Sequence, residues 1–147
     1  MKLSTKARYG TRALLELALR QGEGPVLLKE IAKKQQISLP YLEHLVSPLI
    51  AGGIIRSIKG PKGGIYLAKT PGKINLSEVM QLLEGSVAPV DCVNDPGTCD
   101  RSEFCVTRDI WSELKEAMEG VLGSTTLQDL VERHKKKEQP QPAMYYI

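Results

Sequence analysis

The stretch of residues 37–68, ISLPYLEHLVSPLIAGGIIRSIKGPKGGIYLA, constrains the fold more than any other part of the chain. Ser38 is a good N-cap, because its hydroxyl can accept hydrogen bonds from the free amides of a helical first turn. The helix that it begins is stopped by Gly52-Gly53, since glycine readily adopts the left-handed conformation found at helix ends. Two short apolar runs, IIRSI and IYLA, then flank the turn KGPKGG. This pattern is typical of a β-hairpin, here with a basic, glycine-rich tip.

Two further helical patterns precede this stretch. Ser4 can cap a helix that runs to about Gly22, and residues 27–35 form a second, shorter amphipathic pattern. Two helices, a tight turn, a third helix and a hairpin are the element order of a winged helix-turn-helix. The sequence therefore predicts a mainly α fold with a winged helix-turn-helix DNA-binding domain over residues 1–75. A small α-plus-β domain without a nucleic-acid partner is the alternative.

The second half of the chain contains a long amphipathic helix. Apolar residues recur along it at spacings of three and four: Val106, Ile110, Leu114, Ala117, Met118, Val121 and Leu122. The winged domain has little apolar surface left to cover this stripe, so we expect the helix to pack on a second copy in a homodimer; packing on its own domain is the alternative. We assign residues 76–135 to a cysteine-containing loop and dimerisation helices, the last capped by Thr125 or Thr126. Residues 136–147 are predicted to be a flexible C-terminal tail.

The charges of the chain are unevenly distributed. The first 75 residues carry 13 Lys and Arg against 4 Asp and Glu, whereas the remaining residues carry 7 against 13. A basic half favours a phosphate-bearing partner, and with the predicted fold it indicates double-stranded DNA. A dispersed, solvated basic surface is the alternative. The sequence lacks an uninterrupted apolar run of the length of a secretory signal or a membrane span, so we expect a cytoplasmic protein.

Three groups of side chains could contact DNA: the polar face of the third helix, the basic tip of the hairpin and the first helix. The predicted DNA-binding residues are Arg8, Arg12, Ser38, Pro40, Tyr41, Glu43, His44, Lys59 and Lys62. Glu43 can accept a hydrogen bond from a cytosine amino group, whereas lysines and arginines supply phosphate contacts that give affinity but little sequence information. For Glu43, a place on the solvated surface is an equally good interpretation.

All three cysteines lie in one acidic loop, DCVNDPGTCDRSEFC. An odd number of cysteines argues against a disulfide framework in a reducing compartment. Six residues separate Cys92 from Cys99 and five separate Cys99 from Cys105, which fits the tight pairs of structural zinc sites poorly and suits an iron-sulfur cluster better. The spacing alone leaves a cluster, zinc and no metal open. A thiol oxidoreductase is disfavoured because the chain has no CxxC pair, so we do not expect an enzyme.

Four segments together resemble a known family. MKLSTKARYG, ISLPYLEHLVSPLIAGGIIRSIKGPKGGIYLAKTP, LSEVMQLLEGSVAPVDC and GSTTLQDLV closely resemble the Rrf2 family of bacterial transcription regulators. The three cysteines resemble the IscR-like, cluster-binding branch of that family. SLPYLEHLVSPL and the terminal AMYYI are more similar to the CymR-like branch, which regulates cysteine metabolism and lacks the cluster cysteines.

The resemblance implies a winged-helix homodimer that represses transcription from a pseudo-palindromic operator, with the long helices of two copies crossing. It also implies an iron-sulfur cluster on Cys92, Cys99 and Cys105, favoured as 2Fe-2S with 4Fe-4S as the alternative, presented beside the DNA-binding domain and sensing iron-sulfur or redox status. The residues of the IscR discrimination switch correspond to Pro40, Glu43 and Lys59 here, and Pro40 lacks a side-chain donor. The alternative function is a sulfur or cysteine-metabolism repressor controlled by a protein partner such as cysteine synthase, captured through Tyr145-Tyr146-Ile147.

The fourth cluster ligand differs from the relatives. The cluster branch has a histidine three residues after the last cysteine, where this chain has Arg108, and another branch uses an acidic residue of the other subunit at the place of Arg8. A guanidinium stays protonated and cannot bind iron. Asp109 is the favoured replacement, although a role in stabilising the start of the helix is as good an interpretation. The other candidates are Glu103, Asp100, Asp95, Thr107, a water or an external thiol.

Overall fold

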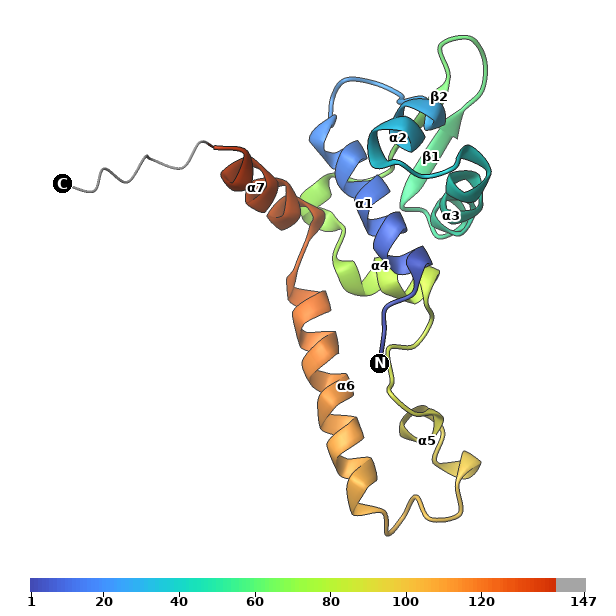
Figure 1. Ribbon diagram of the computed structural model, residues 1–147, viewed down its shortest axis with the longest axis vertical. Coiled ribbons are helices and arrows are strands. Elements are labelled where there is room, and N and C mark those ends of the chain that lie inside the picture. The colour runs from blue at the N-terminus through green and yellow to red at the C-terminus, as the bar shows by residue number, and fades with distance from the viewer. Residues whose placement is uncertain (140–147) are drawn as a thin grey trace, which may run out of the picture.

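The computed structural model describes residues 1–139, and the predicted partner-binding segment Tyr145–Ile147 lies outside them. Seven α-helices, two strands and two short 3-10 helices follow one another in that part of the chain: α1 (Thr5–Leu19), α2 (Leu28–Gln35), α3 (Leu39–Ala51), β1 (Ile55–Ile58), β2 (Gly64–Leu67), η1 (Pro71–Lys73), α4 (Leu76–Leu83), α5 (Asp91–Asn94), η2 (Pro96–Thr98), α6 (Val106–Ser124) and α7 (Leu127–Glu138). The prediction of a mainly α, winged helix-turn-helix fold is confirmed (Figure 1).

The helix boundaries follow the caps that the sequence indicated. The hydroxyl of Ser4 accepts from the amide of Ala7 at 3.2 Å, and that of Ser38 accepts from the amide of Tyr41 at 3.3 Å. Between α2 and α3 the backbone of Gln36 takes the left-handed conformation, with φ of 55° and ψ of 47°. This residue makes the tight turn of the helix-turn-helix, and it does so at some conformational cost because it is not glycine.

The hairpin is antiparallel, and its register pairs Ile55 with Leu67 and Ile58 with Gly64. The segment before α2 extends it, because Val26 and Ile65 exchange both backbone hydrogen bonds at 2.8 Å. A Cβ on Gly64 would lie 2.5 Å from the carbonyl oxygen of Val26. The base of the wing is therefore hydrogen-bonded to the segment that leads into α2, a contact that no local sequence pattern indicates.

One hydrophobic core joins the winged domain to α4 and α7. The leucines of α4 pack on glycines of two other helices: a Cβ on Gly10 of α1 would meet the side chain of Leu83, and a Cβ on Gly52 at the end of α3 would lie 2.5 Å from that of Leu82. From α7, Leu127 is fully buried in the same core. Core contacts thus cross the domain boundary predicted at residue 75.

The C-terminal helix begins with a capping box. Thr126 accepts from the amide of Asp129 at 3.1 Å, and the Asp129 carboxylate accepts from the amide of Thr126 at 2.8 Å. The strand-like segment before it also pairs with the chain before α4, since Leu127 donates its amide to the carbonyl of Ile74 at 2.9 Å. This helix extends to Glu138, three residues into the segment predicted as a tail.

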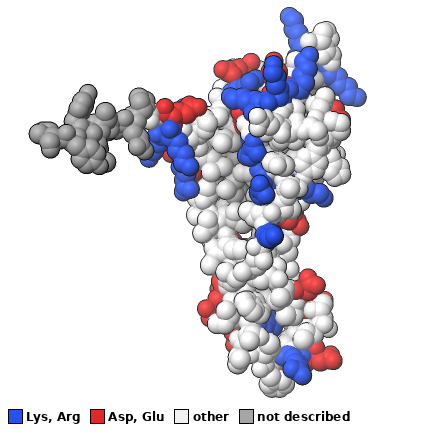
Figure 2. Space-filling view, in the orientation of Figure 1, with Lys and Arg blue, Asp and Glu red and all other residues white. Residues whose placement is uncertain are grey.

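The long helix α6 projects from this body as an arm, with the cysteine loop and α5 at its far end (Figure 1). It has no buried residue. Its solvent-facing side includes Val106, Ile110 and Val121, which are 76%, 55% and 67% exposed. No helix within residues 1–139 is long and apolar enough to cross a membrane. On the face shown in Figure 2, lysines and arginines are most numerous over the body that carries the wing and α7.

Candidate nucleic-acid interface and cysteine loop

The third helix presents a polar face beside a buried one. Leu42, Leu45, Val46 and Leu49 are buried, as the sequence predicted. Ser38, Pro40, Glu43 and His44 are exposed on the remaining surface. This geometry gives a helix one side free to enter a DNA groove, where base edges present donors, acceptors and methyl groups.

The side chain of Tyr41 contacts two residues of α1, Thr5 and Tyr9. Its hydroxyl shares a 2.8 Å hydrogen bond with that of Thr5, and its ring meets that of Tyr9 edge to face with centroids 6.1 Å apart. Tyr41 is half-buried as a result. It remains at the edge of the exposed face of α3, but its polar atom already has a partner.

The wing carries its charge at the tip and along one strand. Lys59 and Lys62 are exposed, and the turn between them is closed by the amide of Gly63, which donates to the carbonyl of Gly60 at 2.9 Å. Arg56, on β1, is also exposed and adds a cation at the side of the same hairpin. Arg56 was not among the predicted DNA-binding residues, although the alternation in IIRSI places it opposite the buried face.

Arg8 and Arg12 lie one turn apart on α1, but their surroundings differ. Both guanidinium groups lie over the ring of Tyr9, at 5.7 and 5.2 Å from its centroid. Arg12 also donates two hydrogen bonds to Gln35, one to the side-chain oxygen at 3.0 Å and one to the backbone carbonyl at 2.7 Å. Of the two predicted phosphate contacts, Arg12 therefore already has a protein partner.

The cysteine loop has a defined backbone. The buried hydroxyl of Ser102 donates to the carbonyls of Pro96 and Cys99 at 2.8 and 2.9 Å, and Asp95 accepts from the amide of Gly97 at 3.0 Å. The three thiols are free, with Cys99 exposed and the other two half-buried. Within residues 1–139, no three His, Cys, Asp or Glu side chains are gathered closely enough to hold a metal ion.

Arg108, which stands where the cluster branch has a histidine, has a structural contact instead. Its Nε donates to the backbone carbonyl of Cys92 at 2.9 Å. This bond draws the start of the loop against the first turn of α6, which follows Cys105 directly. Two of the three thiol-bearing residues are thus tied to the same end of one helix.

The thiol of Cys105 lies in surroundings that favour its ionised form. Its Sγ is 3.1 Å from the hydroxyl oxygen of Thr107. Hydrogen bonds from that hydroxyl and then from the amide of Arg108 lower the pKa of Cys105 below its ordinary value, while desolvation and the carboxylate of Asp109 act in the opposite direction. A thiolate is the form of cysteine that binds metals.

The loop and the predicted DNA-binding surface of α3 and the wing lie at opposite ends of a single chain (Figure 1). The chain between them contacts the start of α1: the carboxylate of Glu84, just after α4, accepts from the amide of Ser4 at 2.7 Å. Beside this contact is an apolar groove of about 560 Å³, with Leu3, Val87 and Val121 among its lining residues. The expected position of the loop beside a DNA-binding domain is not met within one chain, so it would require a partner chain.

The family model and the HTH-type relatives that match this chain are all named as transcriptional regulators. Residues 3–133 match the family Rrf2, described as iron-dependent transcriptional regulator. The chain is 42% identical over 130 residues to the HTH-type transcriptional regulator CymR of Bacillus subtilis, covering 88% of this chain and 89% of that protein. It is 40% identical over 131 residues to the HTH-type transcriptional regulator IscR of Xenorhabdus nematophila, covering 89% and 79%. The solved structure of T. potens IscR is similar with a TM-score of 0.81 and 38% identity, covering 99% of this chain and 97% of that one.

Proposed function

Because the chain belongs to the Rrf2 family of transcriptional regulators, we propose that it is a dimeric repressor that senses iron-sulfur or redox status through its cysteine loop. As a member of that family it is a DNA-binding regulator of transcription and not an enzyme. The observation that carries the finer proposal is the set of three free thiols on one loop at the start of α6, in a chain similar to IscR. We place its action in the cytoplasm, where a bacterial operator is found.

DNA binding uses the exposed side of α3 and the wing. In this proposal Glu43 and His44 reach base edges in the major groove, with Ser38, Pro40 and Tyr41 at the entry of the helix. Lys59, Lys62 and Arg8 contact phosphates, because each is exposed and cationic. The missing side-chain donor at Pro40 alters the base preference relative to IscR-like switches.

A second copy of the chain covers the exposed face of α6. The apolar positions Ile110, Leu114, Ala117 and Val121 are spaced by four, three and four residues, as in the seam between two packed helices. A two-fold axis near the middle of this series would place Ile110 of one chain opposite Val121 of the other. Two recognition helices related by that axis then read a pseudo-palindromic operator.

The donor set of the loop fits an iron-sulfur cluster. Cys92, Cys99 and Cys105 would hold it, with Asp109 as the favoured fourth ligand because it is next to Arg108 and lies in the first turn of α6. A bound cluster would supply a centre whose loss or oxidation reports the iron and redox state of the cell. The three thiols must come closer to one another to hold it, since in residues 1–139 they are not close enough to bind one metal centre.

The chain's own residues give that movement a route to the DNA-binding surface. Arg108 ties the start of the loop to the first turn of α6, and Ser102 holds the middle of the loop together, so a movement of the thiols would be passed to the segment that leads back to α4. There Leu83 packs on α1 and Leu82 on the end of α3. A shift of α4 would thus change the angle between these two helices.

The decisive experiment is anaerobic purification of the protein and of three variants, Cys92→Ala, Cys99→Ala and Cys105→Ala. The wild type should show visible absorbance with matching iron and sulfide, and each variant should lose it. Thr98→Ala is a matched control, because this loop hydroxyl donates only to the carbonyl of Asp95 and should be dispensable. Colourless wild-type protein whose DNA binding is unchanged in all three variants would refute the cluster proposal.

The fourth ligand is tested in the same way. Asp109→Ala should leave a cluster that is lost faster in air, whereas Glu113→Ala, which removes an exposed carboxylate one turn further along α6, should leave the rate of loss unchanged. Equal rates in both variants would exclude Asp109.

A second candidate function is repression of cysteine metabolism through a protein partner. The similarity to CymR, whose solved structure is described as that of the global cysteine regulator of B. subtilis, supports it. Cysteine synthase should then bind the full chain and should not bind a chain that lacks Tyr145–Ile147. If the enzyme binds neither form, this candidate is excluded.

A further inference from the structure

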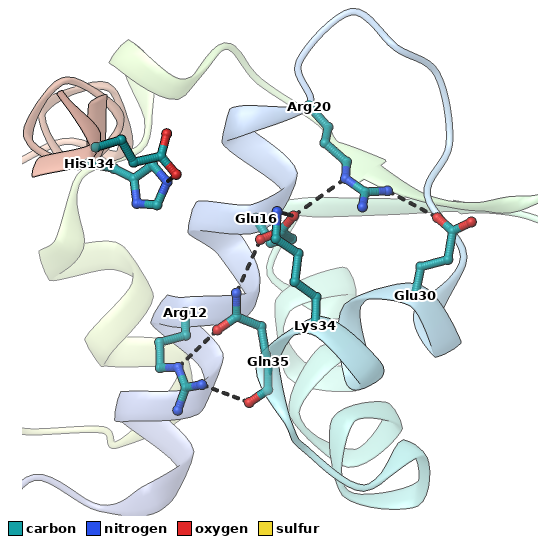
Figure 3. A network of polar contacts seen from close by, with 8 residues as sticks. Arg12, Glu16, Arg20, Glu30, Lys34, Gln35 and His134 are labelled. Atoms are coloured by element: carbon teal, nitrogen blue, oxygen red, sulfur yellow. Dashed lines mark hydrogen bonds and ion pairs between the residues drawn. The ribbon is translucent and has the colours of Figure 1, made fainter. Parts of the chain in front are cut away.

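A polar network joins α1 to α2 beside the turn of the helix-turn-helix (Figure 3). Its central residue is Glu16 of α1, which is 1% exposed. Its Oε2 accepts from the side-chain amide of Gln35 at 3.1 Å, while Oε1 lies 2.7 Å from Nζ of Lys34 and 3.4 Å from Nε of Arg20. Oε1 accepts no well-directed hydrogen bond, so its two contacts are electrostatic.

Gln35 is the last residue of α2, and it connects this buried carboxylate to Arg12. The side chain of Gln35 donates to Glu16 and accepts from Nε of Arg12, while its backbone carbonyl accepts from Nη2 of Arg12 at 2.7 Å. The last carbonyls of a helix lack partners within the helix and carry partial negative charge, so a guanidinium there is stabilising twice over. The forked geometry suits arginine and cannot be reproduced by lysine.

The next residue explains why this site matters for DNA recognition. Gln36 adopts the left-handed conformation that turns the chain from α2 into α3, a conformation disfavoured for a residue with a side chain. We propose that Arg12 is a positioning residue for recognition, which holds the end of α2 and thereby the angle of α3, and that it does not serve as a phosphate contact. Ring contacts of Arg12 with Tyr9, and of Tyr9 with Tyr41, add a second tie between α1 and α3.

The neighbouring Arg8 provides a matched control. It lies one turn earlier on the same helix and over the same ring, and it is exposed as Arg12 is, but no described side-chain hydrogen bond uses its guanidinium. A phosphate contact and a positioning contact differ in two measurable ways. Losing one phosphate contact lowers the salt slope of log K by about 0.9 for each subunit, and a lysine restores it because only charge is needed. A positioning contact leaves the slope unchanged and is not restored by lysine.

The experiment uses a duplex selected from a randomised library by the wild-type protein, with an unrelated duplex of equal length as the non-specific probe. Affinity is measured against salt concentration for Arg12→Ala, Arg12→Lys, Gln35→Ala, Arg8→Ala and Arg8→Lys. Both Arg12 variants and Gln35→Ala should lose about three- to tenfold in affinity for the selected duplex for each subunit of the dimer, as expected for one or two hydrogen bonds, with little change on the unrelated duplex and an unchanged slope. Arg8→Ala should lose slope on both duplexes, and Arg8→Lys should recover it.

Amide hydrogen exchange and thermal unfolding are recorded for each variant. Faster exchange at residues 36–38 in Arg12→Ala, with the global unfolding transition retained, is the direct sign of a loosened turn. The inference is overturned if Arg12→Lys behaves like the wild type, if Arg12→Ala lowers the salt slope as Arg8→Ala does, or if Arg12→Ala changes nothing. The inference rests on the DNA binding described above, and that premise fails separately if the wild type selects no duplex.

Discussion

Truncation of Ile110 tests whether the exposed face of α6 is the dimer interface. Ile110 is 55% exposed in the single chain, so a partner helix could bury about half of its surface. Ile110→Ala removes three carbon atoms, each worth about 0.8 kcal/mol when fully buried, and burial of the 55% that is exposed gives about 1.3 kcal/mol for each subunit. The change occurs twice in a two-fold dimer, so the dimer should weaken by about 2.6 kcal/mol, or about a hundredfold in Kd.

Sedimentation velocity over a concentration series measures this change directly. Alanine has a higher helix propensity than isoleucine, so α6 itself should not be weakened by the substitution. Ile58→Ala is the matched control, because Ile58 is 46% exposed on the wing strand, away from α6, and its truncation should leave the dimer unchanged. If Ile110→Ala dimerises within about twofold of the wild type, or if Ile58→Ala weakens the dimer equally, this face of α6 is not the interface.

Four further outcomes are expected. Lys59→Ala and Lys62→Ala, tested separately, should each lower the salt slope of DNA binding by about 0.9 per subunit. The stability of the folded state should not change, because both side chains are exposed at the wing tip. An unchanged slope in both variants would show that the wing does not contact DNA. Gly64→Ala should destabilise the protein by roughly 1–3 kcal/mol in chemical denaturation, since its Cβ would press on the backbone of Val26. Gly53→Ala is the control for backbone strain alone, because Gly53 has a positive φ of 76° and its Cβ would meet nothing within 4 Å. Equal losses of stability in the two variants would mean that backbone strain, not the contact with Val26, sets the cost. Thr126→Ala should cost about 1 kcal/mol through loss of the α7 cap. Hydrogen bonds to Thr126, first to its backbone amide and then to its side chain, hold the pKa of Asp129 below its ordinary value. The stability that Asp129 contributes is therefore present above about pH 4 and is lost as the pH falls through its folded-state pKa. An unfolding midpoint that changes with pH identically in wild type and Asp129→Asn would contradict this.

The sequence was most informative where structure is decided locally. Ser4, Ser38 and Thr126 cap helices because each hydroxyl needs only an amide two or three residues ahead. The hairpin between residues 54 and 68 follows from two apolar runs and a glycine-rich turn. The α3 face was predicted correctly for the same reason, since a periodicity of 3.6 residues separates buried from exposed positions whatever the rest of the fold does.

Contacts between distant residues could not be predicted in this way. Arg108 and Cys92 are 16 residues apart, and their hydrogen bond depends on how the loop folds back on α6. The burial of Leu127 in the core of the winged domain likewise depends on α6 ending where α7 can return to the body. Local patterns identify an apolar face, but they do not specify which surface will cover it.

The order of the main elements, the concentration of basic residues in the first 75 positions and the three thiols of the loop can all be recognised in the sequence alone. The tertiary structure decided which of those groups are available. Arg12 was predicted to contact phosphate on charge alone, but the fold brings a helix-terminal carbonyl and a glutamine, 23 residues away, within hydrogen-bonding distance of its guanidinium. The charge of Arg12 is a property of the residue, whereas its hydrogen-bond partners are set only when α1 and α2 pack together.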